Sequence, residues 1–303
     1  MSDRPNTAVF VSVALATFNG EKHLACLLDS LVEQTRLPDE VVVSDDGSQD
    51  QTLAILQRYK GQLPLYIHQQ PRPVGIVANF RHAVSLCRGD VIAFCDQDDV
   101  WLPHKVATGL AALERIDGSD PALIFTDLEV VDQQLNRIAP SYWNHRQLHP
   151  ERETFGSLLY GNFVTGCTAM FNRPMAEEIK RMPDDALMHD FWLACVAYGI
   201  GQVRYLTKPS VRYRQHPDNV TLNNAITFNT RWRRLNRFIV DNQYASEYLL
   251  PEIRQAELFC RYYNAQLDAA RRQQLNAFIQ LKRKSPTYRR WRAFLTKFLY
   301  WIE

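Results

Sequence analysis

The stretch Asp90-Val91-Ile92-Ala93-Phe94-Cys95 runs directly into Asp96-Gln97-Asp98-Asp99, so an apolar run ends abruptly on three carboxylates. Because the run is short and rich in β-branched and aromatic residues, it predicts an interior strand of a parallel sheet. The carboxyl ends of such strands are where open α/β sheets bind ligands. Clustered acids repel one another unless a cation neutralises them, and carboxylate oxygens suit magnesium or manganese. From this stretch alone, a solvated acidic turn is the alternative.

Strand and helix patterns alternate before this junction. Val9 to Ala16 and Glu40 to Ser44 are β-branched apolar runs, and each is followed by leucine or isoleucine at helical spacing. A third short run, Leu63 to His68, precedes a predicted helix over Ala78 to Leu86. Repeated strand-helix units imply right-handed crossovers, so the sequence predicts an α/β fold with a mostly parallel sheet flanked by helices.

Polar residues follow the first two predicted strands and suit a nucleoside. Thr17 and Asn19 come after the first strand, and Asp45 and Asp46 after the second. Neither G-x-G-x-x-G nor G-x-x-x-x-G-K-[ST] occurs, which argues against dinucleotide and P-loop sites. A carboxylate such as Asp45 can accept a hydrogen bond from N3–H of uracil or thymine. A turn followed by a helix cap explains the same residues when they are taken in isolation.

Charge divides the chain into two parts. With 303 residues, 46% of them hydrophobic, it can bury a core plus one appended unit. Residues 1–225 carry 20 basic and 27 acidic side chains (net −7), whereas residues 226–303 carry 15 and 6 (net +9). We therefore expect one domain over 1–225 and a helical, basic C-terminal region over 226–303.

Composition also bears on location and partners. No run approaches the ~18 apolar residues that span a bilayer, and the first residues lack the layout of a secretory signal. The six cysteines are scattered without zinc or redox spacing and indicate reduced core residues. The sequence therefore predicts a cytoplasmic protein, and no nucleic-acid partner is expected.

The polar motifs, taken in order, resemble those of one family. They are Thr17-Phe18-Asn19, Val43-Ser44-Asp45-Asp46-Gly47-Ser48, Asp96-Gln97-Asp98-Asp99-Val100-Trp101, His189-Asp190 and Tyr213-Arg214-Gln215-His216. This series is similar to the family 2 glycosyltransferases of the GT-A fold, and the resemblance makes the first part of the chain a GT-A-like catalytic domain. The motif forms are most like those of bacterial enzymes that build surface polysaccharides and O-antigens, rhamnosyltransferases among them. One departure is Val-Ser-Asp-Asp where many members have Val-Asp-Asp; Asp45 is aligned with the first acid.

The resemblance implies an inverting, metal-dependent glycosyltransferase. Its donor would be a UDP- or dTDP-sugar, possible donors including rhamnose, and its acceptor a cell-envelope glycan or lipid-linked sugar. The implied nucleotide contacts are Thr17, Asn19, Asp45 and Asp96, with Asp45 on the base and Asp96 on the ribose. Asp98 and His216 are the implied ligands of manganese or magnesium.

Sugar transfer also needs a base remote from the metal, because the acceptor hydroxyl attacks from the face opposite the leaving group. Asp190 begins an amphipathic run and matches the family's base, although a helix cap is the alternative for an Asp at this position. Trp101 and Trp192 are expected to wall the acceptor pocket by stacking on sugar rings, with core packing as the alternative.

Two other functional classes deserve a test. Asp96-Gln97-Asp98-Asp99-Val100 fits the haloacid-dehalogenase phosphatase pattern, in which Asp96 would be the nucleophile. That motif belongs on the first strand of its fold, whereas at least three strand-helix units precede it here. A non-catalytic glycan-binding module is the other class, and the presence of Asp98 and Asp190 argues against it.

The C-terminal region has its own pattern. Trp232, Leu235, Phe238 and Ile239 share one face of a first predicted helix. Near the end, Trp291, Phe294, Leu295, Phe298, Leu299 and Ile302 form an apolar stripe among Lys282, Arg283, Lys284, Arg289, Arg290, Arg292 and Lys297. The pattern over residues 282–302 therefore predicts a helix lying in the membrane interface. Such a helix would make the protein peripheral at the inner face of the membrane. Packing against the catalytic domain or in a homodimer is the alternative.

Overall fold

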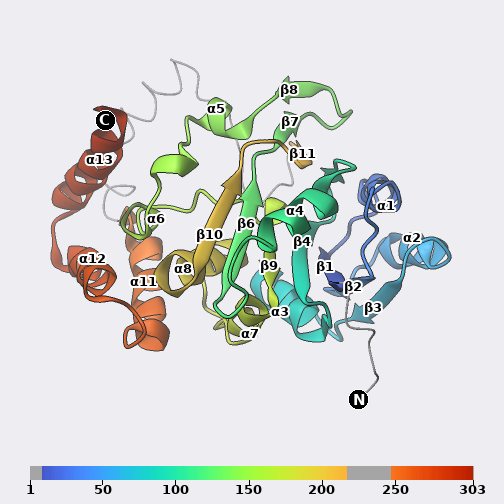
Figure 1. The fold of residues 1–303 in the computed structure, drawn as a ribbon, viewed down its shortest axis with the longest axis horizontal. Helices are drawn as coiled ribbons and strands as arrows, with labels where there is room; N and C mark the ends of the chain where they lie inside the picture. The colour runs from blue at the N-terminus through green and yellow to red at the C-terminus, as the bar shows by residue number, and fades with distance from the viewer. Residues whose placement is uncertain (1–8, 217–246, 303) are drawn as a thin grey trace.

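A seven-stranded sheet forms the centre of the molecule, for which the computed structural model describes residues 9–216 and 247–302 (Figure 1). Its strands are β1 (Val11–Thr17), β2 (Glu40–Asp45), β3 (Leu65–Gln69), β4 (Val91–Asp96), β6 (Ala122–Thr126), β9 (Met170–Asn172) and β10 (Gln202–Leu206). They lie in the order β10-β6-β9-β4-β1-β2-β3. Only β9 runs antiparallel to its neighbours among the described strands of this sheet. The predicted α/β fold with a mostly parallel sheet is confirmed.

Helices cover both faces of this sheet, which explains why its strands are nearly continuous apolar runs. Along β1, Val11, Val13 and Leu15 pack into one core, whereas Ala14 and Ala16 pack into the other. The first core includes α1 (Leu24–Val32), α2 (Thr52–Tyr59) and α4 (Lys105–Leu113). The second includes α3 (Ile76–Leu86), α7 (Arg173–Lys180) and α8 (His189–Ile200).

A second, four-stranded sheet stands at the carboxyl end of the first. Its strands are β5 (Val100–Trp101), β11 (Val211–Arg214), β7 (Glu129–Val131) and β8 (Arg137–Ala139), in that order. Strand β5 follows the acidic turn after β4, and β11 pairs with it antiparallel. The segments between β8 and α8 add α5 (Tyr142–Arg146), η1 (Pro150–Arg152), α6 (Phe155–Leu158) and η2 (Gly166–Thr168). This small sheet brings the end of β11 back to the acidic turn.

The C-terminal helices share the core of α8. They are α11 (Leu250–Tyr263), α12 (Ala269–Ile279), η3 (Gln280–Arg283) and α13 (Pro286–Ile302). Helix α11 packs on α8, and α12 packs on α6. Phe259 and Tyr263 of α11 are buried, and the ring centroid of each lies 6.0 Å from that of Trp192. The predicted boundary at 225/226 and the predicted face of Trp232, Leu235, Phe238 and Ile239 lie outside the described residues.

Helix α13 buries Ala293 and two basic residues, and leaves Trp291 and Phe294 of its apolar stripe exposed. Ala293, Arg289 and Arg290 are buried, with exposed fractions of 1%, 5% and 8%. Trp291 and Phe294 are instead more than half exposed. The stripe members Phe298, Leu299 and Ile302, and the basic Lys297, have side chains outside the described set. Over residues 9–216 and 247–302, every helix falls short of the length and apolarity that crossing a bilayer requires.

Phe259→Ala should lower the free energy of unfolding by about 3–5 kcal/mol, because it removes a fully buried ring that joins α11 to α8. The ring fills the space beside Gly199, where an added Cβ would lie 2.7 Å from its Cζ. Urea unfolding measures the change. The control Arg261→Ala, an exposed position on the same helix, should change it by less than about 0.5 kcal/mol. A loss below about 1 kcal/mol for Phe259→Ala would mean that α11 contributes little to this core.

Candidate active site

The ends of β1 and β2 are joined through the buried carboxylate of Asp45. Thr17 and Asp45 are paired in the parallel register, and Thr17 Oγ1 donates to Asp45 Oδ2 at 2.8 Å. The Oγ and backbone N–H of Ser48 donate to the two oxygens of Asp45 at 2.6 and 2.9 Å. These three bonds fix the fully buried Asp45 carboxylate at the end of β2. Asn19 closes the same loop by accepting from the Gln49 amide at 2.8 Å.

Phe18 lies between these polar groups, and its ring is 47% exposed. Its backbone is held on both sides by Gln97, whose Oε1 accepts from Phe18 N–H and whose Nε2 donates to Phe18 O, both at 2.9 Å. Asp46 accepts from the amides of Val74 and Gly75 at 2.6 and 2.9 Å and so positions the start of α3. Sequence reasoning gave Phe18 no role; the available signal was an aromatic residue in the middle of a polar motif.

Asp98 and His216 meet although 118 positions separate them. Asp98 Oδ2 lies 2.8 Å from His216 Nε2, and both side chains are largely shielded, with exposed fractions of 21% and 9%. The imidazole of His23, just before α1, lies beside His216 with ring centroids 5.1 Å apart. Burial and the charge of Arg214 lower the pKa of His23. The predicted pair is thus brought together by the return of β11.

Asp99 and Arg214 hold this return in place. The buried Asp99 Oδ1 accepts from the backbone N–H of Arg214 at 3.1 Å. The Arg214 guanidinium donates from Nε to the carbonyl of Asp98 at 2.9 Å. Since Arg214 is two residues before His216, these bonds set the distance between Asp98 and the imidazole.

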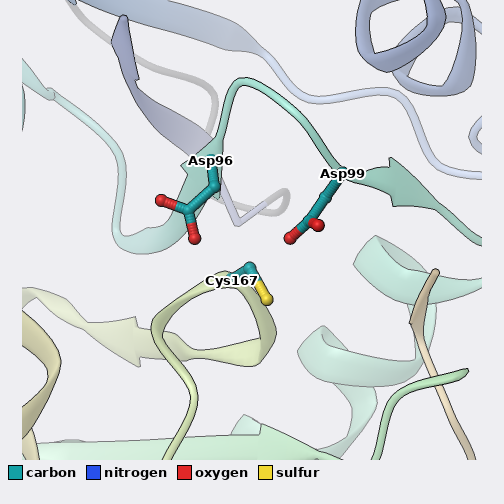
Figure 2. Close-up of side chains that lie close together, drawn as sticks. All are labelled: Asp96, Asp99 and Cys167. Carbon is teal, nitrogen blue, oxygen red and sulfur yellow. The ribbon is translucent and has the colours of Figure 1, made fainter. Parts of the chain in front are cut away.

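A second acidic cluster lies behind the turn. Asp96 and Asp99 both point toward Cys167 of η2 (Figure 2), and one ligand atom from each of the three lies within 4.8 Å of the others. Burial and the charges of Asp98 and Asp190 raise the pKa of Asp96 to about 8. Burial and the charges of Asp98 and Asp96 hold the pKa of Asp99 well above its usual range. Lys105, fully buried, donates from Nζ to the Cys167 carbonyl at 2.8 Å and supplies the compensating charge.

The two clusters differ in their fitness for a divalent cation. The cluster of Asp96, Asp99 and Cys167 has two fully buried members, and burial holds the Cys167 thiol in its neutral form by raising its pKa. A thiol also suits softer metals than magnesium or manganese. Asp98 and His216 keep some exposure, offer one carboxylate oxygen and one imidazole nitrogen, and already converge at 2.8 Å. The donor set of Asp98 and His216 therefore fits a divalent cation, and its nitrogen favours manganese over magnesium.

Asp190 stands in the first turn of α8, where its Oδ2 accepts from the Gly166 amide at 3.3 Å. Met188, rather than Asp190, is the N-cap residue of this helix. Burial raises the pKa of Asp190 to about 6, although bonds from Gly166 and Asn162 oppose that shift. The carboxyl therefore titrates just below neutral pH, where a general base works well.

A cleft of about 230 Å³ opens onto Asp190. Its walls are apolar at Phe163, Leu187 and Met188 and polar at Tyr142, Asn162, Thr165 and Glu252. Typical sites for drug-sized ligands hold about 300–1,000 Å³, so this cleft suits a single sugar unit. Glu252 comes from the first turn of α11, so the C-terminal helices contribute to the cleft wall.

Trp101 and Trp192 do not wall a pocket, and this expectation was wrong. Their exposed fractions are 2% and 0%, which leaves no ring face for a sugar. Trp101 packs in the first core with Lys105 Nζ 4.6 Å from its ring centroid, and Trp192 packs under α11. A tryptophan after a polar motif has the same sequence signature whether it turns inward or outward.

Residues 12–180 match the sequence profile described as glycosyl transferase family 2, and the chain belongs to this family. It is a glycosyltransferase, as the motifs predict. The haloacid-dehalogenase alternative is not favoured, because Asp96 ends the fourth strand of the chain rather than the first.

Individual relatives agree with this assignment. A dTDP-rhamnosyl transferase, RfbG of Shigella flexneri, is 26% identical over 235 residues, which are 73% of this chain and 78% of the relative. Two solved structures share the fold at lower identity. TarS residues 1–349 of S. aureus in complex with UDP gives a TM-score of 0.56 at 20% identity, covering 93% of this chain and 89% of that one. A Pyrobaculum calidifontis mannosyltransferase with GDP-Man and Mn²⁺ gives 0.58 at 18%, covering 97% and 76%.

Proposed function

We propose that this glycosyltransferase moves a sugar, rhamnose being the first candidate, from a UDP or dTDP donor to a hydroxyl of a cell-envelope glycan or lipid-linked acceptor, with inversion. The observation that carries the proposal is the arrangement of two separate charge sites beyond the same sheet edge. At one of them Asp98 Oδ2 and His216 Nε2 lie 2.8 Å apart, and at the other Asp190 lines a sugar-sized cleft. The dTDP-rhamnosyl relative supports the choice of donor.

The nucleotide would lie over the ends of β1, β2 and β4. The exposed Phe18 offers a stacking face for the base, and Asp45, which is fully buried, is the proposed acceptor from N3–H. Thr17 and Asn19 shape this loop through the bonds described above. Asp96, partly buried at the end of β4, is the proposed ribose contact.

The leaving diphosphate would lie beside Asp98 and His216. A divalent cation held by these two side chains supplies charge neutralisation as a Lewis acid when it is bound. Asp98 contributes the oxygen and His216 the nitrogen, and the Asp99–Arg214 bonds hold both in register. The enzyme would act in the cytoplasm at the inner face of the membrane.

The acceptor hydroxyl would lose its proton to Asp190. The raised pKa leaves this carboxyl largely ionised at neutral pH and basic enough to accept the proton. Asn162 and Glu252 can accept hydrogen bonds from neighbouring sugar hydroxyls in the cleft. One base acting on the acceptor gives a single displacement and therefore inversion.

The nucleotide and the stereochemistry are tested separately. Calorimetry with UDP and dTDP, with and without Mn²⁺, should show binding that the metal strengthens. If neither nucleotide bound, the whole proposal would fail.

NMR of the product made from a donor of known anomeric configuration should show the opposite configuration at that carbon. Net retention would overturn the single displacement.

The acid limb of the pH profile should reflect Asp190. Because its pKa is raised to about 6, kcat/KM should fall about tenfold per pH unit below pH 6 as the base becomes protonated, and level off above it. Initial rates from pH 4.5 to 8 at saturating metal measure the limb. A midpoint near pH 4, the ordinary range of an aspartate, would mean that the reacting base is another, solvated group.

A further inference from the structure

A second cleft lies away from Asp190. It holds about 620 Å³ between α6, α12, η3 and α13, at the C-terminal edge of the molecule (Figure 1). Ser157, Tyr160 and Gln274 supply hydroxyl and amide groups, and Lys284 and Arg292 supply positive charge. Among the described residues that line it there is no aspartate or glutamate. The lining of the cleft therefore carries a net positive charge.

Exposed aromatic residues accompany this cleft along α13. Tyr288 lines it and is 41% exposed, with Lys284 Nζ 5.9 Å from its ring centroid. The Trp291 ring lies 5.8 Å from that of Tyr288, and Phe294 is exposed one turn further along α13. Aromatic rings beside basic side chains are characteristic of helices that lie in a membrane interface.

We propose that this cleft binds the phosphate headgroup of an anionic membrane lipid while Trp291 and Phe294 enter the headgroup-acyl boundary. Lys284 and Arg292 would face the phosphate, and the Tyr160 hydroxyl and the Gln274 side-chain amide would donate to its oxygens. Only some of the basic residues that the sequence analysis assigns to the membrane surface are available to a lipid headgroup. Arg289 and Arg290 are buried and do not face a bilayer, and Lys282 has its charge paired with Glu257 at 2.8 Å.

A second copy of the chain fits this surface less well. A two-fold interface places each patch against its own copy, which would bring Arg283, Lys284 and Arg292 close to the same residues of the partner. Like charges facing one another across an interface oppose association, and the cleft lining offers no acid to offset them. An anionic lipid surface has the complementary charge.

The cleft borders the acceptor side of the enzyme. Tyr160 lines the lipid cleft, and Asn162 and Thr165 of the same segment line the cleft of Asp190. A membrane bound at α13 would therefore lie next to the proposed entry of the acceptor. This consequence rests on the proposed function, whereas lipid binding itself does not.

Vesicle binding by the full chain tests the proposal. Binding should be much stronger to phosphatidylglycerol vesicles than to phosphatidylcholine vesicles at low salt. Since each basic residue at an anionic surface strengthens binding about fivefold, the double variant Lys284→Gln/Arg292→Gln should weaken it about 30-fold. The matched control Arg58→Gln/Lys60→Gln removes two exposed charges at the end of α2, across the molecule, and should stay within twofold of wild type (Figure 1).

A second pair of variants tests the cleft itself. Ala277 is exposed on α12 and lines the cleft, so both substitutions there are compatible with folding. Ala277→Glu should lower affinity for phosphatidylglycerol vesicles about fivefold, whereas Ala277→Gln, of equal size, should not. Equal binding to both vesicle types, or equal effects of Glu and Gln, would overturn the proposal. The proposal would also be overturned if light scattering showed a dimer that dissociates in the Trp291→Ala variant. UDP calorimetry on each variant should remain unchanged, which separates this outcome from a failure of the transferase assignment.

Discussion

Asp190→Asn is expected to lower kcat by about 10²–10⁴-fold while UDP or dTDP binding stays unchanged. The amide keeps the size of the side chain, and its oxygen can still accept from the Gly166 amide, but it cannot take a proton from the acceptor. Steady-state kinetics combined with nucleotide calorimetry measures both parts. The prediction depends on the cleft position of Asp190 and on its pKa of about 6.

Glu252→Gln is the matched control, since it neutralises another carboxyl that lines the same cleft. It should raise the acceptor KM and leave kcat within about tenfold, because a residue that binds substrate and transition state alike changes KM. If Asp190→Asn retained wild-type kcat, Asp190 would serve only to hold the η2 segment through Gly166.

Asp98→Ala should weaken Mn²⁺ binding by more than about 100-fold and make nucleotide affinity independent of the metal. Loss of a supporting residue around a metal usually costs 10–100-fold, and loss of a ligand costs more. The substitution leaves His216 without its partner at 2.8 Å, while the carbonyl that Arg214 contacts is retained. Calorimetry with Mn²⁺ alone, and then with UDP or dTDP, measures the effect.

The control is Asp117→Ala, which removes an exposed carboxylate in the turn between α4 and β6, at the opposite edge of the sheet. It should leave Mn²⁺ affinity unchanged. If Asp98→Ala kept its Mn²⁺ affinity while Asp99→Ala or Cys167→Ala lost it, the cation would bind instead at the buried cluster of Asp96, Asp99 and Cys167.

Several parts of the fold were predictable because a strand covered on both faces must be apolar at successive positions. That requirement makes β1, β2 and β4 visible in the sequence to within a residue or two. Strand β9 was not predicted, since three residues are too few to establish a period. The four-stranded sheet was missed for the same reason. Its strand β11 is the element that brings His216 back to Asp98.

Some residues of the candidate site could likewise be predicted from the sequence, and others could not. Asp98, Asp190 and His216 were proposed from the order of their motifs, and the structure places Asp98 against His216 and Asp190 in a cleft. Glu252 had no signal, because a lone acid in the first turn of a helix is common. Trp101 and Trp192 were placed wrongly, because aromatic residues suit a core and a sugar pocket equally.

The sequence by itself determined the family, the α/β class and the chemical types available at the carboxyl edge of the sheet, because these depend on local patterns and motif order. Only the tertiary structure decided which way side chains face. In the structure Trp101 and Trp192 are buried and Trp291 is exposed. Asp99 accepts a hydrogen bond from the backbone N–H of Arg214. Such choices depend on contacts between residues far apart in the chain, and helical or strand periodicity does not encode them.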